Sequence, residues 1–402
     1  MAAIDSSTPS EPGARLWQVD ALRGLMLVLM TLTHLPTVVA GPAGQPFGFV
    51  SAAEGFVLLS GFMAGMVYAA RERREGRSRM RSAFYRRVGK IYLCQAALLL
   101  FLFSVIALIA VVLQEEAITG LLEYYLQEPL HALVGGLLLI YSPPLLDILP
   151  LYVLLMLVSP VLLLHGLRRG WGGILALSVA LWLAAQFKFG AWVYEALAPA
   201  AGIRVPLAQT GAFDVLAWQF PWVLGLWLGA GRSAQPPQPV PAFPRWMLVL
   251  ATAIAAIGFV WRHVVGQVPL PHDPGLNLLF DKWQLAPLRL LNLFALLVLA
   301  LHWAPWLARH LPRVRALEVM GAASLPVFCV HLVLALLALS LFGAPTPWRP
   351  LWIDAAILAV SFAVLYAVAL LSRELDRLSA TPRPAAPGAA RSPPSTTHSH
   401  PR

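Results

Sequence analysis

The residues best suited to chemistry in this sequence lie close to its start, inside a long apolar stretch. Asp20, Arg23 and His34 occur in QVDALRGLMLVLMTLTHLP. In a helix, the step from Arg23 to His34 returns to within roughly 20° of the same face while rising roughly 16 Å. Asp20 lies one turn before Arg23, where it can orient the guanidinium. One helix face therefore carries a cation near one end and, farther along, an imidazole that exchanges protons near neutral pH.

This arrangement has two interpretations. In the functional one, Arg23 holds an anionic donor that enters from the cytoplasm, and His34 transfers a proton near the far side of the membrane. In the structural one, Asp20 and Arg23 form an ion pair at the membrane interface, and His34 hydrogen-bonds a neighbouring helix, as polar groups often do in membranes. The spacing is consistent with both.

Three further polar residues are candidates for the same site. Glu54, in FVSAAEGFVLLSGFMAG, is expected either at the outer mouth of a cavity or as a solvated carboxylate. Ser60 is a hydrogen-bond donor in the same segment, whereas Gly61 and Gly65 beside it favour close helix packing. His331, in GAASLPVFCVHLVLALL, lies deep in another apolar stretch. A histidine there has either a structural partner or a functional role, because an ionisable side chain is costly inside a membrane.

Other chemistries lack their motifs. The sequence has no HExxH, no paired cysteine ligands and no phosphate-cradling glycine loop, so neither a metal site nor a bound cofactor is expected. Cys94 and Cys329 fall in apolar stretches and are expected to be small core residues rather than a disulfide. The net charge of +10 does not indicate nucleic-acid binding, because the basic residues lie between apolar stretches rather than on a soluble domain.

The elements that must position these residues are transmembrane helices. The 402 residues are 59% hydrophobic and 12% charged, whereas an ordinary soluble domain has about 25% charged residues. Apolar stretches of about 18 or more residues, long enough to cross a bilayer as helices, recur along the chain. The expected fold is an all-α polytopic membrane protein with about ten transmembrane helices, at residues 21–40, 49–70, 91–113, 147–167, 172–189, 211–231, 245–263, 285–303, 318–342 and 350–372.

Basic residues set the expected orientation. Residues 71–90 carry nine Lys and Arg and are predicted to form a cytoplasmic loop, which places both termini in the cytoplasm. The segment 128–146, interrupted by proline and glycine, is counted as non-spanning, because a span there would move later basic loops outside. The expected organisation is a cytoplasmic segment at 1–18, a transmembrane domain at 19–373 and a disordered, Pro- and Ser-rich cytoplasmic tail at 379–402.

Several stretches resemble a known family. DALRGLMLVLMTLTHLP and FGFVSAAEGFVLLSGFMAG are similar to the OpgC family of membrane proteins, which is linked to succinyl substitution of osmoregulated periplasmic glucans. Shorter similar pieces are DILPLY from Asp147, AWQF from Ala217, RLLN from Arg289 and SLPVFCVH from Ser324. The resemblance runs from about residue 16 to residue 371, nearly the whole membrane part.

A second resemblance is broader. The spacing of Arg23 and His34, the SGF at Ser60 and the late His331 resemble the acyltransferase-3 superfamily of membrane O-acyltransferases. The two resemblances imply a multi-pass protein of the bacterial inner membrane that moves an acyl group from a cytoplasmic acyl-CoA, such as succinyl-CoA, to a periplasmic glucan or another envelope polysaccharide. The implied site residues are His34 as the catalytic imidazole, Arg23 and Asp20 for the donor, and, in the cavity, Glu54, Ser60 and His331.

A different class of function fits the same polar residues. In a membrane transporter or exporter of a glycan or a small anionic solute, Arg23, His34 and Glu54 would line a substrate or proton path. The sequence has no detectable inverted repeat of the kind that many transporters contain, which favours the enzyme. Binding or hydrolysis of acyl-CoA would distinguish the two, since only the enzyme requires it.

Overall fold

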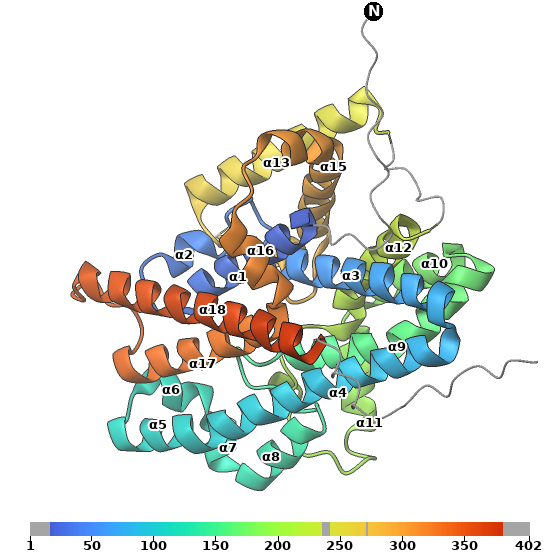
Figure 1. The fold of residues 1–402 in the computed structure, drawn as a ribbon. Coiled ribbons are helices and arrows are strands. Elements are labelled where there is room, and N and C mark those ends of the chain that lie inside the picture. The colour runs from blue at the N-terminus through green and yellow to red at the C-terminus, as the bar shows by residue number, and fades with distance from the viewer. Residues whose placement is uncertain (1–16, 235–241, 271, 381–402) are drawn as a thin grey trace, which may run out of the picture.

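The computed structural model describes residues 17–234, 242–270 and 272–380, and every regular element in these ranges is a helix (Figure 1). The longer helices are α1 (Trp17–His34), α3 (Ala52–Glu75), α4 (Arg77–Phe101), α9 (Ile148–Arg169), α10 (Gly172–Gln186), α12 (Val215–Arg232), α13 (Arg245–Val265), α15 (Pro287–His310), α17 (Ser324–Phe342) and α18 (Leu351–Ala380). The shorter ones are α2 (Ala40–Ala43), the π-helix η1 (Leu102–Ile106), α5 (Ala107–Leu113), α6 (Glu116–Leu121), α7 (Glu123–Gln127), α8 (Pro129–Leu137), α11 (Phe189–Leu197), the 3-10 helix η2 (Leu207–Gln209), α14 (Pro274–Asn277), the 3-10 helix η3 (Leu278–Phe280) and α16 (Arg315–Ala322).

Seven of the described helices are long and apolar enough to cross a membrane, or eight if the bent pair of α10 and α11 is one broken span. The seven are α3, α4 continued through η1 and α5, α9, α13, α15, α17 and α18. Each of the ten predicted spans overlaps at least one helix, but α1 and α12 are not apolar enough to qualify as spans, and α10 alone is too short. The all-helical, multi-pass membrane class is therefore confirmed, and seven or eight helices meet these criteria for spanning.

Local sequence explains where the helices around α1 begin and end. α1 stops at His34 because Pro36 follows, and the residue before a proline avoids the helical conformation. The predicted span 318–342 is divided at Ala323 into α16 and α17. Pro326 causes this break, because it has no N–H to bond back along the helix and its ring crowds the preceding turn. The break leaves Ser324 in the first turn of α17, beside α1.

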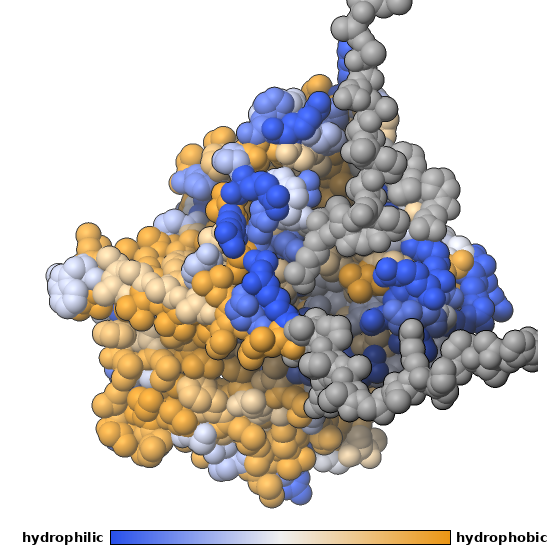
Figure 2. Space-filling view, viewed as in Figure 1, coloured by the Kyte–Doolittle hydropathy of each residue, from blue (hydrophilic) through white to orange (hydrophobic). Residues whose placement is uncertain are grey.

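The predicted loop at 71–90 is wrong, because most of it is helical. α3 continues to Glu75 and α4 begins at Arg77, so only Gly76 separates them, with a φ of 82° that glycine adopts without strain. Arginine, glutamate and methionine are good helix formers, so these residues extend two long helices. Figure 2 shows hydrophilic residues gathered over this α3–α4 end and a broad hydrophobic surface over α17, α18 and α5.

Two other segments depart from straight spans. Helix α8 occupies the first half of the segment 128–146, and its nine residues rise about 13 Å, less than half the thickness of the hydrocarbon layer. The predicted span 172–189 ends at Gln186, after which Lys188 adopts a φ of 57° and the chain bends by 76° into α11. Of the tail predicted to be disordered, Ala380 still belongs to α18 and 381–402 lie outside the described residues, as does most of the N-terminal segment.

Glycines allow two pairs of helices to approach closely around the site. Gly61 and Gly65 of α3 face α12, and a Cβ added to Gly65 would overlap the carbonyl oxygen of Leu226. Gly321 of α16 faces α1, and a Cβ there would overlap the carbonyl oxygen of Asp20. Small residues at such crossings let membrane helices pack backbone to backbone. α1 is thus held in contact with α3, α16 and α17, which together position its polar face.

Candidate active site

Two histidines from different helices form the centre of the candidate site. His34, the last residue of α1, stacks on His331 of α17 with ring centroids 5.3 Å apart and an interplanar angle of 14°. Nδ1 of His34 lies 3.0 Å from Nε2 of His331, and Nδ1 of His331 lies within hydrogen-bond distance of the Phe328 carbonyl oxygen. His331 is fully buried, whereas His34 is half-buried and lines a cavity.

The hydrogen bonds define the tautomer of each ring. A carbonyl oxygen can only accept, so His331 carries its proton on Nδ1 and, when neutral, accepts at Nε2. The donor to that Nε2 is Nδ1–H of His34, which leaves Nε2 of His34 unprotonated in the neutral ring. A histidine oriented in this way can take a proton from a hydroxyl group or attack an electrophile.

His34 opens onto a large cavity of about 540 Å³, which is within the usual range of small-molecule sites. The wall is formed by residues of several helices and of the loops between them, and it mixes apolar surface with hydroxyl, amide and charged groups. The polar residues that line this large cavity are Thr33, His34, Ser51, Glu123, Tyr124, Ser142, Asp147, Gln209 and Lys282. A wall of this kind suits a ligand that is rich in hydroxyl groups.

Asp147 and Lys282 lie at this cavity, outside the spanning helices. The Asp147 carboxylate accepts the N–H of Ala212 at 3.3 Å. Burial raises the pKa of Asp147 to about 6, although the Ala212 hydrogen bond and the positive charge of Lys282 oppose that rise. Burial also lowers the pKa of Lys282, and the negative charges of Glu54 and Asp147 partly offset this effect. The charge of the cavity wall therefore changes near pH 6, where Asp147 titrates.

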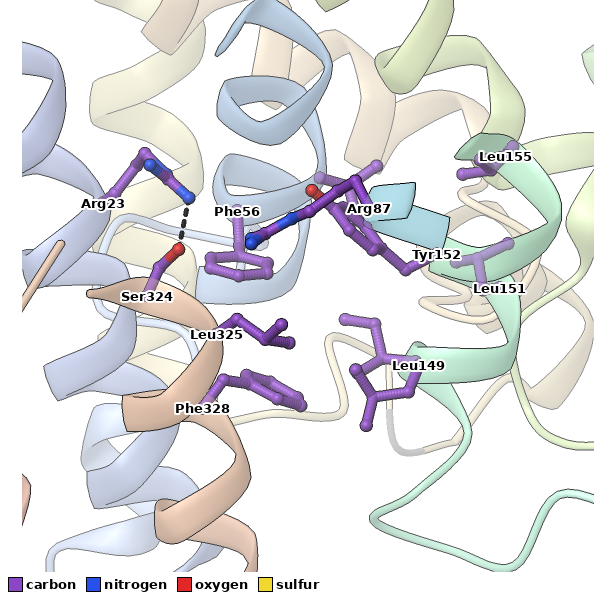
Figure 3. A pocket seen from close by; sticks show the side chains of 12 residues that line it. Arg23, Phe56, Arg87, Leu149, Leu151, Tyr152, Leu155, Ser324, Leu325 and Phe328 are labelled. Carbon is purple, nitrogen blue, oxygen red and sulfur yellow. Dashed lines mark hydrogen bonds between the residues drawn. The ribbon is translucent and has the colours of Figure 1, made fainter. Parts of the chain in front are cut away.

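Arg23 lies at a second, narrow pocket of about 20 Å³, which has room for roughly one water molecule (Figure 3). Its guanidinium donates to Ser324 Oγ and lies 3.8 Å from an Asp20 carboxylate oxygen. Arg87 of α4 reaches into the same pocket from another wall, beside Phe56. Two guanidinium groups thus face one narrow space whose other walls are mostly apolar.

The narrow pocket and the large cavity adjoin. Ile148 and Phe328 line both of them. The sequence predicts that Arg23 and His34 share one face of α1. In the structure Arg23 lies at the narrow pocket and His34 at the large cavity. A linear ligand whose anionic head lies at Arg23 could therefore extend past Phe328 to the imidazole of His34.

Of the predicted site residues, Arg23 and His34 line these two spaces, whereas Asp20, Glu54, Ser60 and His331 line neither. Glu54 is fully buried and forms an ion pair with Arg289 of α15, which is 1% exposed. It also belongs to the capping box of α3, because its Oε2 accepts the N–H of Ser51 at 3.0 Å. Ser60 is buried within α3. The structure thus brings together Arg23 with Asp20 and His34 with His331, and it places Glu54 behind the cavity wall that Ser51 lines.

A family model described as OpgC protein matches residues 15–377. The chain belongs to the OpgC family. No curated protein and no solved structure matches it. Membership of the OpgC family indicates a membrane enzyme that modifies glucans, so the glucan-linked family predicted from the first two apolar stretches is confirmed. The match includes every residue of the narrow pocket and the large cavity.

Two basic residues of this candidate site are not distinguished by sequence reasoning. Arg87 is one of nine basic residues between 71 and 90, and nothing in that run marks it as facing a pocket. Lys282 is one of only three lysines in the chain, and it lies between predicted spans on the side where basic residues are scarce. That contrast is the signal that could have identified Lys282.

Proposed function

We propose that this protein is a membrane O-acyltransferase. It transfers an acyl group, with succinyl as the favoured example, from a cytoplasmic acyl-CoA to a hydroxyl group of a periplasmic glucan or another envelope glycan. The observation that carries this proposal is His34, whose Nε2 is unprotonated in the neutral ring that lines the large cavity and whose Nδ1–H is held by His331. Membership of the OpgC family supports a glucan as the acceptor.

The narrow pocket is the proposed entry for the donor. Arg23 and Arg87 offer two guanidinium groups, which bind phosphate well because their donors match its oxygens in pairs. The apolar walls suit the uncharged chain that joins the nucleotide of CoA to its thioester. The basic α3–α4 end favours a cytoplasmic position for this side of the molecule. Since the pocket holds roughly one water molecule, its walls must move apart before the chain can reach His34.

The chemical step needs one base. The acceptor hydroxyl oxygen attacks the thioester carbonyl carbon while Nε2 of His34 takes the hydroxyl proton. The carbon–sulfur bond then breaks, and His34 returns the proton to the departing thiolate, so the products are an oxygen ester and free CoA. His331 keeps accepting from Nδ1–H and thereby holds the ring in place.

An alternative route through the same histidine is covalent. Nε2 of His34 attacks the thioester carbonyl carbon, the carbon–sulfur bond breaks, and CoA leaves as the thiolate from an acyl-histidine. The acceptor hydroxyl then attacks the acyl carbon, the carbon–nitrogen bond breaks, and the freed Nε2 takes the hydroxyl proton before releasing it to solvent. Both routes use the same ring orientation. The mass of protein quenched after mixing with acyl-CoA alone distinguishes them, because only the covalent route adds an acyl group to the peptide that contains His34.

The proposal is tested by mass spectrometry of periplasmic glucans from cells that lack the gene. These cells receive either the wild-type gene or His34→Asn, in which the asparagine amide can still donate to His331 but offers no base. An acyl mass that disappears with the gene and returns only with the wild type is the expected result. Fully acylated glucans without the gene would contradict a glucan acceptor, and glucans retained in the cytoplasm would favour the transporter.

A further inference from the structure

Lys282 places a positive charge at the large cavity. Of the described residues that line this cavity, it is the only lysine or arginine. Its Nζ lies 4.6 Å from the centre of the Trp283 ring and 6.0 Å from that of Phe213, and both of these residues also line the cavity. It forms no ion pair with any carboxylate in the part of the chain that the structure describes. The ammonium group therefore faces the cavity beside aromatic rings.

The loop that carries Lys282 is held in place. Oδ1 of Asp281 accepts the N–H of Trp283 at 2.6 Å. The indole N–H of Trp218, in α12, donates to the Trp283 carbonyl oxygen at 3.0 Å. These bonds fix the backbone on either side of Lys282, so the position of its charge relative to the cavity is built into the fold.

The surroundings favour an anionic ligand at this position. Burial lowers the pKa of Lys282, which means that the surroundings of its side chain disfavour the charged ammonium. Asp147 and Glu123 also line the cavity and Glu54 lies behind its wall, but none of them forms an ion pair with Lys282. A ligand carboxylate beside Nζ would offset the loss of hydration for both charged groups.

We propose that Lys282 binds the free carboxylate of a dicarboxylic acyl group and thereby selects the acyl chain that is transferred. This inference rests on the proposed function, in which the thioester lies at His34. The part of the acyl group beyond the thioester carbon then extends into the large cavity, which Lys282 also lines. A dicarboxylic acyl group such as succinyl carries its second carboxylate in that part, whereas a monocarboxylic group of the same length ends in a methyl group.

The test compares succinyl-CoA with butyryl-CoA, using a neutral glucan as the acceptor. Equilibrium binding and the rate of transfer are both measured on the purified full-length protein. We expect Lys282→Met to lower the preference for succinyl over butyryl by roughly 10- to 100-fold in both measurements, which is typical of losing a charge-assisted contact. Lys282→Arg should retain most of the preference. Lys188→Met is the matched control, because Lys188 lines neither of the two spaces.

The outcomes separate this inference from the proposed function. Wild-type protein that transfers neither acyl group would overturn the proposed function, while the binding preference would still test Lys282. If Lys282→Met leaves the preference for succinyl intact, the inference is overturned. An equal loss of binding and transfer for both donors would overturn it as well. The transfer assay is repeated with an anionic glucan as the acceptor; a loss that appears only with that acceptor, and equally for both donors, would assign Lys282 to the acceptor and also overturn the inference.

Discussion

The buried ion pair between Glu54 and Arg289 offers a direct test of whether Glu54 is structural or chemical. Both side chains are at most 1% exposed, so Glu54→Gln leaves an uncompensated guanidinium in the interior. Breaking one partner of such a pair costs roughly 3–5 kcal/mol, although glutamine can still serve in the capping box of α3. The double variant Glu54→Gln with Arg289→Met removes both charges and should recover most of this loss, because no unpaired charge remains.

The assay is the fraction of monodisperse protein that remains in detergent after heating, measured together with transfer per folded molecule. Glu54→Gln should lower the midpoint temperature by several degrees, and the double variant should lie between it and the wild type. Glu318→Gln is the control, because Glu318 pairs at 2.8 Å with Arg313, whose side chain is 61% exposed, and should change little. A Glu54→Gln protein that resists heat like the wild type but transfers nothing would refute the structural role.

Three further predictions concern packing, cavity charge and the turn after His34. Gly65→Leu should abolish folded protein on size-exclusion chromatography, because its Cβ overlaps the α12 backbone. Burial raises the pKa of Asp147 to about 6, so its negative charge forms as pH rises through that value. The ratio of succinyl to butyryl transfer should then fall by up to roughly fivefold, because the Asp147 carboxylate repels the succinyl carboxylate by about 1 kcal/mol. In Asp147→Asn the ratio should not change with pH. Arg349 donates to the Pro36 carbonyl and pairs at 2.8 Å with Asp354, which accepts the Val38 N–H at 2.8 Å. Arg349→Gln should therefore lower kcat by roughly 10- to 100-fold through misplacement of His34.

Each of these predictions has its own control. Gly89→Leu should fold, because a Cβ at Gly89 meets nothing within 4 Å, and equal damage at both glycines would contradict the packing argument. The titration of His34 affects both donors alike and so cancels in the succinyl-to-butyryl ratio; a ratio in Asp147→Asn that varies with pH as in the wild type would contradict the assignment. Wild-type kcat in Arg349→Gln would show that the turn after His34 does not depend on the contacts of Arg349 with Pro36 and Asp354.

The polar face of α1 could be predicted from sequence because its signals are local. The helical period relates Arg23 to His34, and Pro36 ends the helix just beyond the imidazole. The depth of His331 could also be read from its apolar neighbours. Its stacking on His34 could not, because 297 residues separate the two and no local pattern specifies which helices become neighbours.

The departures from prediction have the same origin. The sequence suggests that Glu54 lies at a cavity, because it does not show that Arg289 of α15 pairs with it. That pairing depends on tertiary packing. Residues 71–90 were expected to form a loop from their charge, yet helix propensity and a single glycine decide their structure. The large cavity is assembled from loops as well as helices, so Lys282 joins it only when the chain is folded.

The most direct test of the account is the rate of acyl transfer from acyl-CoA to glucan by purified protein carrying changes at His34 and His331. His34→Asn should lower the rate by roughly 10²- to 10⁴-fold, the usual contribution of a general base, while the protein stays folded. His331→Gln, whose side-chain oxygen can accept from Nδ1–H, should keep more activity than His331→Leu. Wild-type transfer by folded His34→Asn would contradict the assignment of His34 as the base.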